Sequence, residues 1–277
     1  AADTLREVGQ IVWREPGLPG FGGLSGLIVS PDGGSLTAVT DRGQMLEARI
    51  ERSAQGTLAS VAVTRFEDLT DPTGAPLARF ATDAEGLAQA ADGGLFVSFE
   101  GRHRIARLPR PFARPRPIPA SPAFVAFSSN SGLEALAVDA VGDVYALAEQ
   151  SADRIPVFRW DGTDWDQPFD IPGDPFFRPT GADFGPRGRL YLLERGFNLL
   201  AGFRIRVRRF ERVTGGWSDG EIVFLGAPNA YDNAEGISLW TTAAGEQRLV
   251  IVSDNNFQAL QRTLLTEFRL QESPAPR

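Results

Sequence analysis

The sequence has no cysteine, no lysine and a single histidine, His103. The missing cysteine excludes a disulfide framework, a thiolate zinc site and a cysteine nucleophile. The missing lysine excludes Schiff-base chemistry. With one histidine, a metal motif built on two histidines is impossible. A Ser-His-Asp triad would have to use that one ring.

Positive charge and long apolar runs are also scarce. The 28 basic residues, all arginine, face 35 acidic ones, which gives a net charge of −7 and argues against nucleic-acid binding. No run approaches the ~18 apolar residues of a membrane helix, so we expect no membrane span. The sequence starts Ala1-Ala2-Asp3, as after signal-peptide cleavage, which favours a periplasmic or secreted protein.

Turn-forming residues are abundant, with 30 glycines and 20 prolines. Long amphipathic helical patterns are hard to find, while short β-branched and aromatic runs are frequent. The composition, 42% hydrophobic and 23% charged, is that of a globular protein large enough for a substantial core. These features predict a single all-β domain over residues 1–277.

A hairpin unit recurs five times along the chain. Each copy has an apolar strand, a Gly-rich turn and a second apolar strand that ends in an acid, as in Glu85-Gly86-Leu87, then Asp92-Gly93-Gly94, then Leu95 to Glu100. The copies start at positions 25, 85, 134, 183 and 235, spaced by 60, 49, 49 and 52 residues. This spacing is typical of four-stranded propeller blades.

Third and fourth strands can be read after most hairpins. Third strands are predicted at 45–50, 104–108, 155–160, 203–210 and 264–270, and fourth strands at 58–66, 116–119, 167–171 and 221–225. The last blade lacks a fourth strand, and the unpaired segment Leu5 to Trp13 can supply it. We therefore predict a five-bladed β-propeller closed by the N-terminal strand. The alternatives are a sixth blade between residues 26 and 85, and a Greek-key β-sandwich.

In a propeller, the start of the first strand and the end of the second emerge on the same face. The predicted start positions are Ser25, Glu85, Glu134, Asp183 and Glu235, and the predicted end positions are Asp41, Glu100, Glu149, Glu194 and Asp254. Nine of these ten residues are carboxylates, which the fold would crowd around one mouth of the central channel. Neighbouring carboxylates repel each other unless a cation intervenes.

A calcium ion at this mouth would satisfy the carboxylates, because Ca²⁺ takes 6–8 oxygen ligands. The candidate metal ligands are Glu85, Glu134, Asp183, Glu235, Asp41 and Asp254, and Glu100, Asn233 and Asn255 are candidate ligand-binding residues. Arg42, Arg102 and Arg195 follow end positions and could pair across the mouth instead. For any single acid, a structural role in capping a strand or pairing with arginine is the simpler interpretation.

Catalytic roles can be assigned on the same geometry. Glu149 or Glu194 would accept a proton from water, His103 is a further candidate base, and Arg42, Arg102 or Arg195 would hold a developing anion. Ser25, in Gly23-Leu24-Ser25-Gly26, does not fit the Gly-x-Ser-x-Gly nucleophile motif.

Several phrases carry a family resemblance. They are Asp83-Ala84-Glu85-Gly86-Leu87, Leu133-Glu134-Ala135-Leu136, Pro179-Thr180-Gly181-Ala182-Asp183, Asn233-Ala234-Glu235-Gly236-Ile237 and Val252 to Phe257. Together they resemble the bacterial phytase-like family described as having esterase-like activity of phytase. The resemblance implies a β-propeller, usually exported, that hydrolyses esters or phosphoesters. The acid-lined mouth also resembles that of calcium-dependent lactonase propellers by analogy of architecture.

The leading hypothesis is a calcium-dependent hydrolase of small phosphate or carboxylate esters, working as a monomer. A non-catalytic propeller that binds a ligand or protein on its acidic face is the alternative. A purely structural module is the third possibility.

Overall fold

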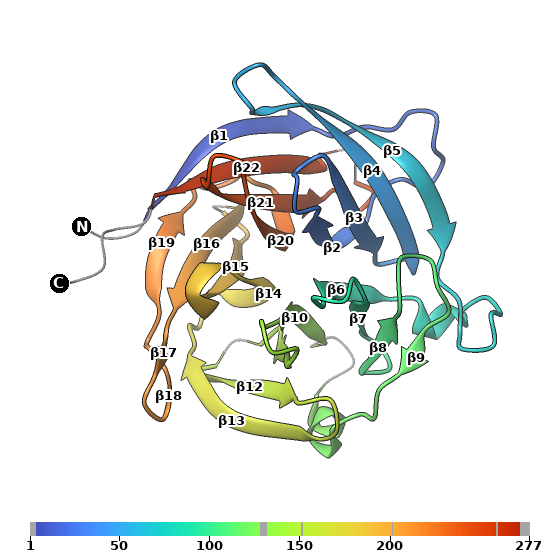
Figure 1. Cartoon of the computed structure of the whole chain (residues 1–277), viewed down its shortest axis with the longest axis vertical. Helices are drawn as coiled ribbons and strands as arrows, with labels where there is room; N and C mark the ends of the chain where they lie inside the picture. The colour runs from blue at the N-terminus through green and yellow to red at the C-terminus, as the bar shows by residue number, and fades with distance from the viewer. Residues whose placement is uncertain (1–3, 128–131, 151, 201, 259, 272–277) are drawn as a thin grey trace.

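The computed structural model describes residues 4–127, 132–150, 152–200, 202–258 and 260–271. Over these residues, five four-stranded antiparallel sheets are arranged as blades around a central axis (Figure 1). Blade 1 consists of β2 (Leu24–Val29), β3 (Ser35–Thr40), β4 (Gln44–Arg52) and β5 (Leu58–Asp68). Blade 2 consists of β6 (Ala84–Gln89), β7 (Leu95–Phe99), β8 (Arg104–Leu108) and β9 (Arg116–Pro117). Blade 3 consists of β10 (Leu133–Val138), β11 (Val144–Ala148), β12 (Arg154–Trp160) and β13 (Trp165–Pro172).

The remaining two blades complete the ring. Blade 4 consists of β14 (Arg178–Phe184), β15 (Leu190–Asn198), β16 (Gly202–Phe210) and β19 (Glu221–Leu225). Blade 5 consists of β20 (Asn233–Thr241), β21 (Gln247–Asp254), β22 (Leu264–Gln271) and β1 (Thr4–Val12). A small hairpin, β17 (Arg212–Val213) with β18 (Gly216–Trp217), and the 3₁₀ helices η1 (Arg79–Ala81), η2 (Pro122–Ala126) and η3 (Pro186–Gly188) lie in the connections. The predicted five-bladed propeller is confirmed.

The N-terminal strand closes the ring, as predicted. β1 pairs antiparallel with β22, from Thr4 opposite Gln271 to Val12 opposite Leu264. The closure joins the two ends of the described chain in one sheet and covers the edge of β22. The alternative of a sixth blade between residues 26 and 85 is wrong: β4 and β5 are long strands that use up this interval, and the described residues there form one sheet, η1 and an isolated bridge.

The core lies between neighbouring blades. Blades 3 and 4, for example, bury Tyr145, Leu147, Leu190 and Leu192 against each other, each with at most 1% of its surface exposed. Truncating such a side chain to alanine typically costs about 2–5 kcal/mol. The blades are therefore held in the ring by side-chain packing, which fixes where their ends lie.

Glycines narrow the channel between the first strands. A Cβ at Gly86 would lie 2.6 Å from the Glu134 carbonyl oxygen, and a Cβ at Gly181 would lie 2.9 Å from that of Glu235. Only glycine permits such close approach of neighbouring backbones. The waist of the channel consequently encloses only about 10 Å³, which separates its two ends.

The helices of the described residues are short 3₁₀ turns, and none is long and apolar enough to cross a membrane.

Candidate metal centre at the acidic mouth

Each first strand carries a β-bulge, and this bulge defines the true start position of the blade. The register shifts at Leu24/Gly26, Ala84/Leu87, Leu133/Ala135, Pro179/Gly181 and Ala234/Gly236. A bulge leaves a residue unpaired and redirects its side chain. The start positions are therefore Ser25, Glu85, Glu134, Thr180 and Glu235.

The end positions follow from the backbone pairing just outside each bulge. The N–H groups of Asp41, Glu100 and Glu149 donate to the carbonyl two residues before the bulge at 2.8–3.0 Å. In blades 4 and 5, the same register pairs Arg195 with Arg178 and Asp254 with Asn233. The end positions are Asp41, Glu100, Glu149, Arg195 and Asp254.

Blade 4 corrects two predictions. Asp183 lies three residues beyond the bulge at Thr180, which puts it at the opposite end of the channel, and Glu194 lies one residue before the end position. The start and end positions of blade 4 were predicted at the wrong residues, because its acids do not occupy the positions that carry acids in the other blades. Thr180 and Arg195 occupy those positions, so the ten positions hold seven carboxylates, two hydroxyls and one arginine, where nine carboxylates were predicted.

Arg195 is held by carboxylates from the neighbouring blades. Its Nη2 donates to Glu149 Oε1 at 2.9 Å, and its Nη1 donates to Asn233 Oδ1 at 2.7 Å and also to Glu235 Oε1. Asn233 in turn donates its Nδ2 to Glu235 Oε1 at 2.6 Å. One buried guanidinium therefore compensates two of the acids at the mouth.

The other acids lack such compensation. Asp83, Glu85 and Glu100 each place a carboxylate oxygen within 4.8 Å of the others. Nearby, three buried oxygens have no hydrogen-bond partner among the described residues: Asp41 Oδ1, Glu134 Oε2 and Asp254 Oδ1. Glu134 and Asp254 are only 8% and 4% exposed. Because buried polar atoms are almost always paired, these three oxygens are candidate ligands for a cation.

The pKa values at the mouth are raised for the same reason. Burial raises the pKa of Asp41 to about 6, and the negative charges of Asp254 and Asp83 add to the effect. Burial raises the pKa of Glu235 to about 7, although Arg195 opposes the shift. Burial also raises the pKa of Glu85, Glu100, Glu134 and Asp254. Burial is the largest cause of each shift, and a proton or a metal ion would relieve it by neutralising the carboxylate.

Asp83 was not among the predicted ligands. It stands two residues before Glu85, where side chains of an extended strand return to the same face. That alternation is visible in the phrase Asp83-Ala84-Glu85, but Asp83 stands outside the start and end positions from which the ligands were predicted.

The remaining predicted residues lie in the connections that follow β3, β7 and β21. The Arg42 guanidinium lies 3.2 Å from the centre of the Phe257 ring, and that of Arg102 lies 5.6 Å from the Phe80 ring centre. Asn255 accepts the Phe257 N–H at 3.1 Å and thereby shapes the loop after β21. The His103 ring packs edge-on against Phe127 at 5.7 Å, in the aromatic cluster under η2.

Glu194 has a different environment, between blades 3 and 4. It is fully buried and accepts four hydrogen bonds, two from Arg206 and two from Arg208, at 2.6–3.1 Å. Arg208 also donates to the Pro172 carbonyl at 2.8 Å. This saturated network is a structural cross-link, and it corrects the prediction that Glu194 accepts a proton at the mouth.

A comparison with protein families shows to which family the chain belongs. The profile described as Phytase-like, esterase-like activity of phytase, matches residues 19–257, which cover the first four blades and the strands β20 and β21 of the fifth. The chain belongs to the Phytase-like family. Its predicted family is thereby confirmed. No curated protein matches the sequence.

Solved structures resemble this Phytase-like chain in fold. An α-L-arabinofuranosidase from Podospora anserina, in complex with cellotriose, is 11% identical with a TM-score of 0.60, and the match covers 98% of each chain. The PQQ-bound aldose sugar dehydrogenase from Streptomyces coelicolor is 12% identical with a TM-score of 0.54, covering 98% of this chain and 99% of that one. At this identity the likeness shows the propeller fold alone.

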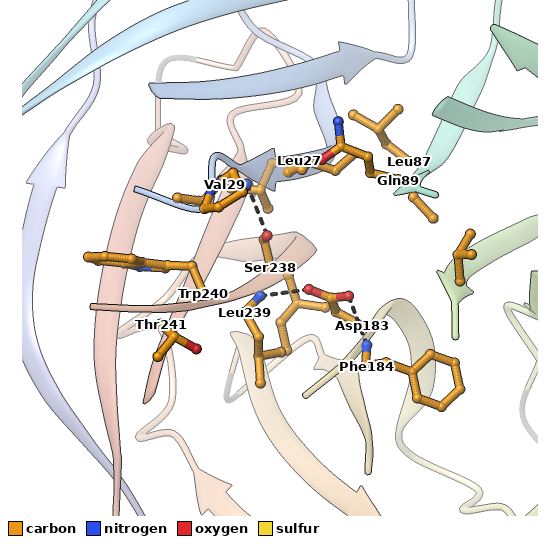
Figure 2. A pocket seen from close by; sticks show the side chains of 15 residues that line it. Leu27, Val29, Leu87, Gln89, Asp183, Phe184, Ser238, Leu239, Trp240 and Thr241 are labelled. Atoms are coloured by element: carbon orange, nitrogen blue, oxygen red, sulfur yellow. Dashed lines mark hydrogen bonds between the residues drawn. The ribbon is translucent and has the colours of Figure 1, made fainter. Parts of the chain in front are cut away.

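The opposite end of the Phytase-like propeller contains a cavity of about 350 Å³, which Asp183 lines (Figure 2). Asp183 accepts the Phe184 N–H on Oδ1 at 2.8 Å and the Leu239 N–H on Oδ2 at 2.6 Å. Ser238 accepts the Val29 N–H at 3.0 Å in the equivalent way. Both side chains thus connect one blade to the next, and burial raises the pKa of Asp183 to about 7.

Proposed function

We propose that the acidic mouth binds a divalent cation, with calcium as the expected ion, and that the chain hydrolyses phosphate or carboxylate esters there. The observation that carries the proposal is the set of three buried carboxylate oxygens without a partner, on Asp41, Glu134 and Asp254. They lie on three different blades around one channel end, next to the acidic triad of blade 2. Calcium prefers this donor chemistry of several carboxylate oxygens.

The residues that would hold the cation are those whose charge the protein leaves uncompensated. Asp83, Glu85 and Glu100 offer oxygens close enough to share one ion, and Glu134 adds an oxygen from the adjacent blade. Asp183 is not among them because it lies at the other channel end. A bound divalent cation would polarise an ester oxygen and lower the pKa of water.

Glu149 is the acid best placed to accept a proton. It lies at the edge of the mouth, lines the adjoining cavity and is 13% exposed at its side chain. Its Oε1 is held by Arg195, which orients the carboxylate toward the cavity edge. A carboxylate held in this way can take a proton from water within hydrogen-bond reach.

The exposed arginines at the rim would stabilise negative charge that develops on the substrate. Arg42 is fixed over the Phe257 ring, and Arg102 lies near Phe80 on the neighbouring blade. Guanidinium groups positioned before reaction stabilise an oxyanion without reorganisation.

Turnover of aryl phosphates, aryl acetates and lactones, with calcium or with EDTA, tests the proposal. We expect hydrolysis that requires calcium and is lost in Glu85→Gln and Glu134→Gln. Hydrolysis that is indifferent to EDTA and to both substitutions would contradict the metal mechanism. Calcium binding without turnover of any substrate would favour a non-catalytic propeller that binds ligands on this face.

A further inference from the structure

A cavity of about 480 Å³ adjoins the acidic mouth at blades 4 and 5. Its inner side consists of Glu149, Arg195 and Glu235, which belong to the mouth. The outer side is different in character, because it presents the aromatic rings of Phe176, Phe197 and Phe203. A space with a charged floor and an aromatic wall is typical of a site for a small amphipathic ligand.

The aromatic wall is held in place by specific contacts. The Phe176 ring packs directly over Gly196 of β15, where any Cβ would overlap the ring. Asp174 fixes the same segment by accepting the Phe176 N–H at 2.8 Å. The rings of Phe197 and Phe203 pack together, with their centres 4.8 Å apart.

Two of these rings nevertheless face solvent. Phe176 is 36% exposed and Phe197 is 54% exposed. Large apolar side chains grouped at the edge of a cavity mark a place where apolar surface is covered by a ligand. Gly196 supports this interpretation, because its missing Cβ leaves room for the Phe176 ring, which is not part of the buried core.

Arg178 adds a positive charge to the same cavity. It stands directly opposite Arg195 in the β14–β15 pair, although like charges in opposite positions destabilise a sheet. Arg195 is neutralised by Glu149 and Glu235, whereas no carboxylate of the described residues forms an ion pair with the exposed Arg178. Its charge is therefore available to an anion that enters the cavity.

We propose that this cavity is the substrate subsite for an aryl-substituted oxyanion, with the anionic group on Arg178 and the ring against Phe197 and Phe203. The substrate class is then aryl esters that carry a phosphate or carboxylate group next to the aromatic ring. This inference rests on the proposed function for the reaction at the mouth. The binding contacts themselves do not involve the cation.

Isothermal titration calorimetry on the 277-residue chain tests the subsite with probes that cannot be hydrolysed. Phenylphosphonate, methylphosphonate and benzoate are titrated with calcium chloride and, separately, with EDTA. The variants are Arg178→Gln and Phe197→Leu. The controls are Arg116→Gln, an exposed arginine on β9, and Val141→Ala, an apolar side chain that is 81% exposed between β10 and β11.

We expect phenylphosphonate to bind about tenfold more weakly to Arg178→Gln, since a charge-assisted hydrogen bond is lost. Phe197→Leu should weaken phenylphosphonate several-fold and leave methylphosphonate unchanged, because only the former has a ring to pack. The controls should bind as the unchanged chain does. The tighter of phenylphosphonate and benzoate identifies the anionic group.

The outcomes separate this subsite from the metal mechanism. Phenylphosphonate binding that depends on Arg178 and Phe197 even in EDTA supports the subsite, whether or not calcium binds at the mouth. No phenylphosphonate binding in either buffer, or binding that neither variant weakens, overturns the subsite. If calcium still binds in that case and Glu134→Gln prevents it, the cation site stands without the subsite.

Discussion

The two ends of the channel use buried carboxylates in opposite ways. At the far end, Asp183 is the one acid among the described residues that line the cavity, and each of its oxygens accepts a backbone N–H. At the mouth, the acids outnumber their partners, and buried oxygens of Asp41, Glu134 and Asp254 accept no hydrogen bond from the described residues. The fold thus pairs both carboxylate oxygens of Asp183 at the far end and leaves one carboxylate oxygen of each of these three acids without a partner at the mouth.

This difference separates structure from function. An unpaired buried oxygen costs about 1–3 kcal/mol, so a fold that keeps several of them in one place gains nothing in stability from them. The blade junctions show that the chain can supply suitable partners, since Ser238 and Asp183 both receive backbone donors. We therefore propose that a ligand completes the set of contacts at the mouth.

The largest expected effect comes from removing the buried guanidinium group of Arg195 at the mouth. Arg195→Gln leaves Glu149 and Glu235 without their ion-pair partner, and breaking such a buried pair typically costs about 3–5 kcal/mol. Urea unfolding in EDTA measures this loss. Arg178→Gln, at the opposed and exposed position, is the matched control and should change the free energy of unfolding little. Equal losses in the two variants would show that Arg195 is not the charge that holds the mouth together.

Calcium should stabilise the chain through the mouth alone. At a concentration 100 times the Kd, a ligand that binds only the folded state adds about 2.7 kcal/mol. We expect Glu134→Gln to lose most of this stabilisation, because its buried Oε2 is one of the unpartnered oxygens. Asp183→Asn should keep it, because Asp183 lies at the other end.

Thermal unfolding with calcium and with EDTA distinguishes these variants. In EDTA, Glu134→Gln should be no less stable than the unchanged chain, since it removes a buried charge with like-charged neighbours. A calcium response of Asp183→Asn as weak as that of Glu134→Gln would remove the distinction between the two ends.

Serine residues near the two ends allow a smaller and more direct comparison. Ser238→Ala takes the acceptor away from the buried Val29 N–H and should cost about 1–3 kcal/mol. Ser25→Ala removes a hydroxyl that donates to the Gly23 carbonyl at 3.3 Å, a long bond, and should cost about 0.5 kcal/mol. Chemical denaturation of both variants checks the order. The reverse order would mean that the Ser238 contact does not hold the blades together.

The fold was predictable because the hairpin repeats five times with its turns intact. The predicted strands at 104–108 and 221–225 coincide with β8 and β19, and the N-terminal segment closes the ring as β1. The third and fourth strands also recur where expected, since each must cover the edge of the strand before it.

The start position of blade 4 was predicted at Asp183 because the prediction relied on the acid and not on the distance from the start position to the turn. Asp183 lies two residues before the turn at Gly185, whereas Glu85 lies six before the turn at Ala91. Thr180, at five, is the better match, and the bulge confirms it. The aromatic wall of Phe176 and Phe197 could not be predicted, since it depends on how the connection between β13 and β14 places Phe176 over Gly196 of β15.

A dependence on pH gives the last comparison, and it belongs to the far end. Burial raises the pKa of Asp183 from 3.8 to about 7, so between these values the folded state keeps a proton that the unfolded state has lost. The contribution of Asp183 to stability is thus fully present below about pH 4 and declines as the pH rises to about 7, by at most about 1.4 kcal/mol per unit. Asp183→Asn cannot ionise, so its free energy of unfolding relative to the unchanged chain should improve from pH 5 to pH 7. Urea titrations of both proteins at these two values, in EDTA, give the difference directly. A difference that does not change with pH would show that Asp183 stays ionised, held by the N–H groups of Phe184 and Leu239.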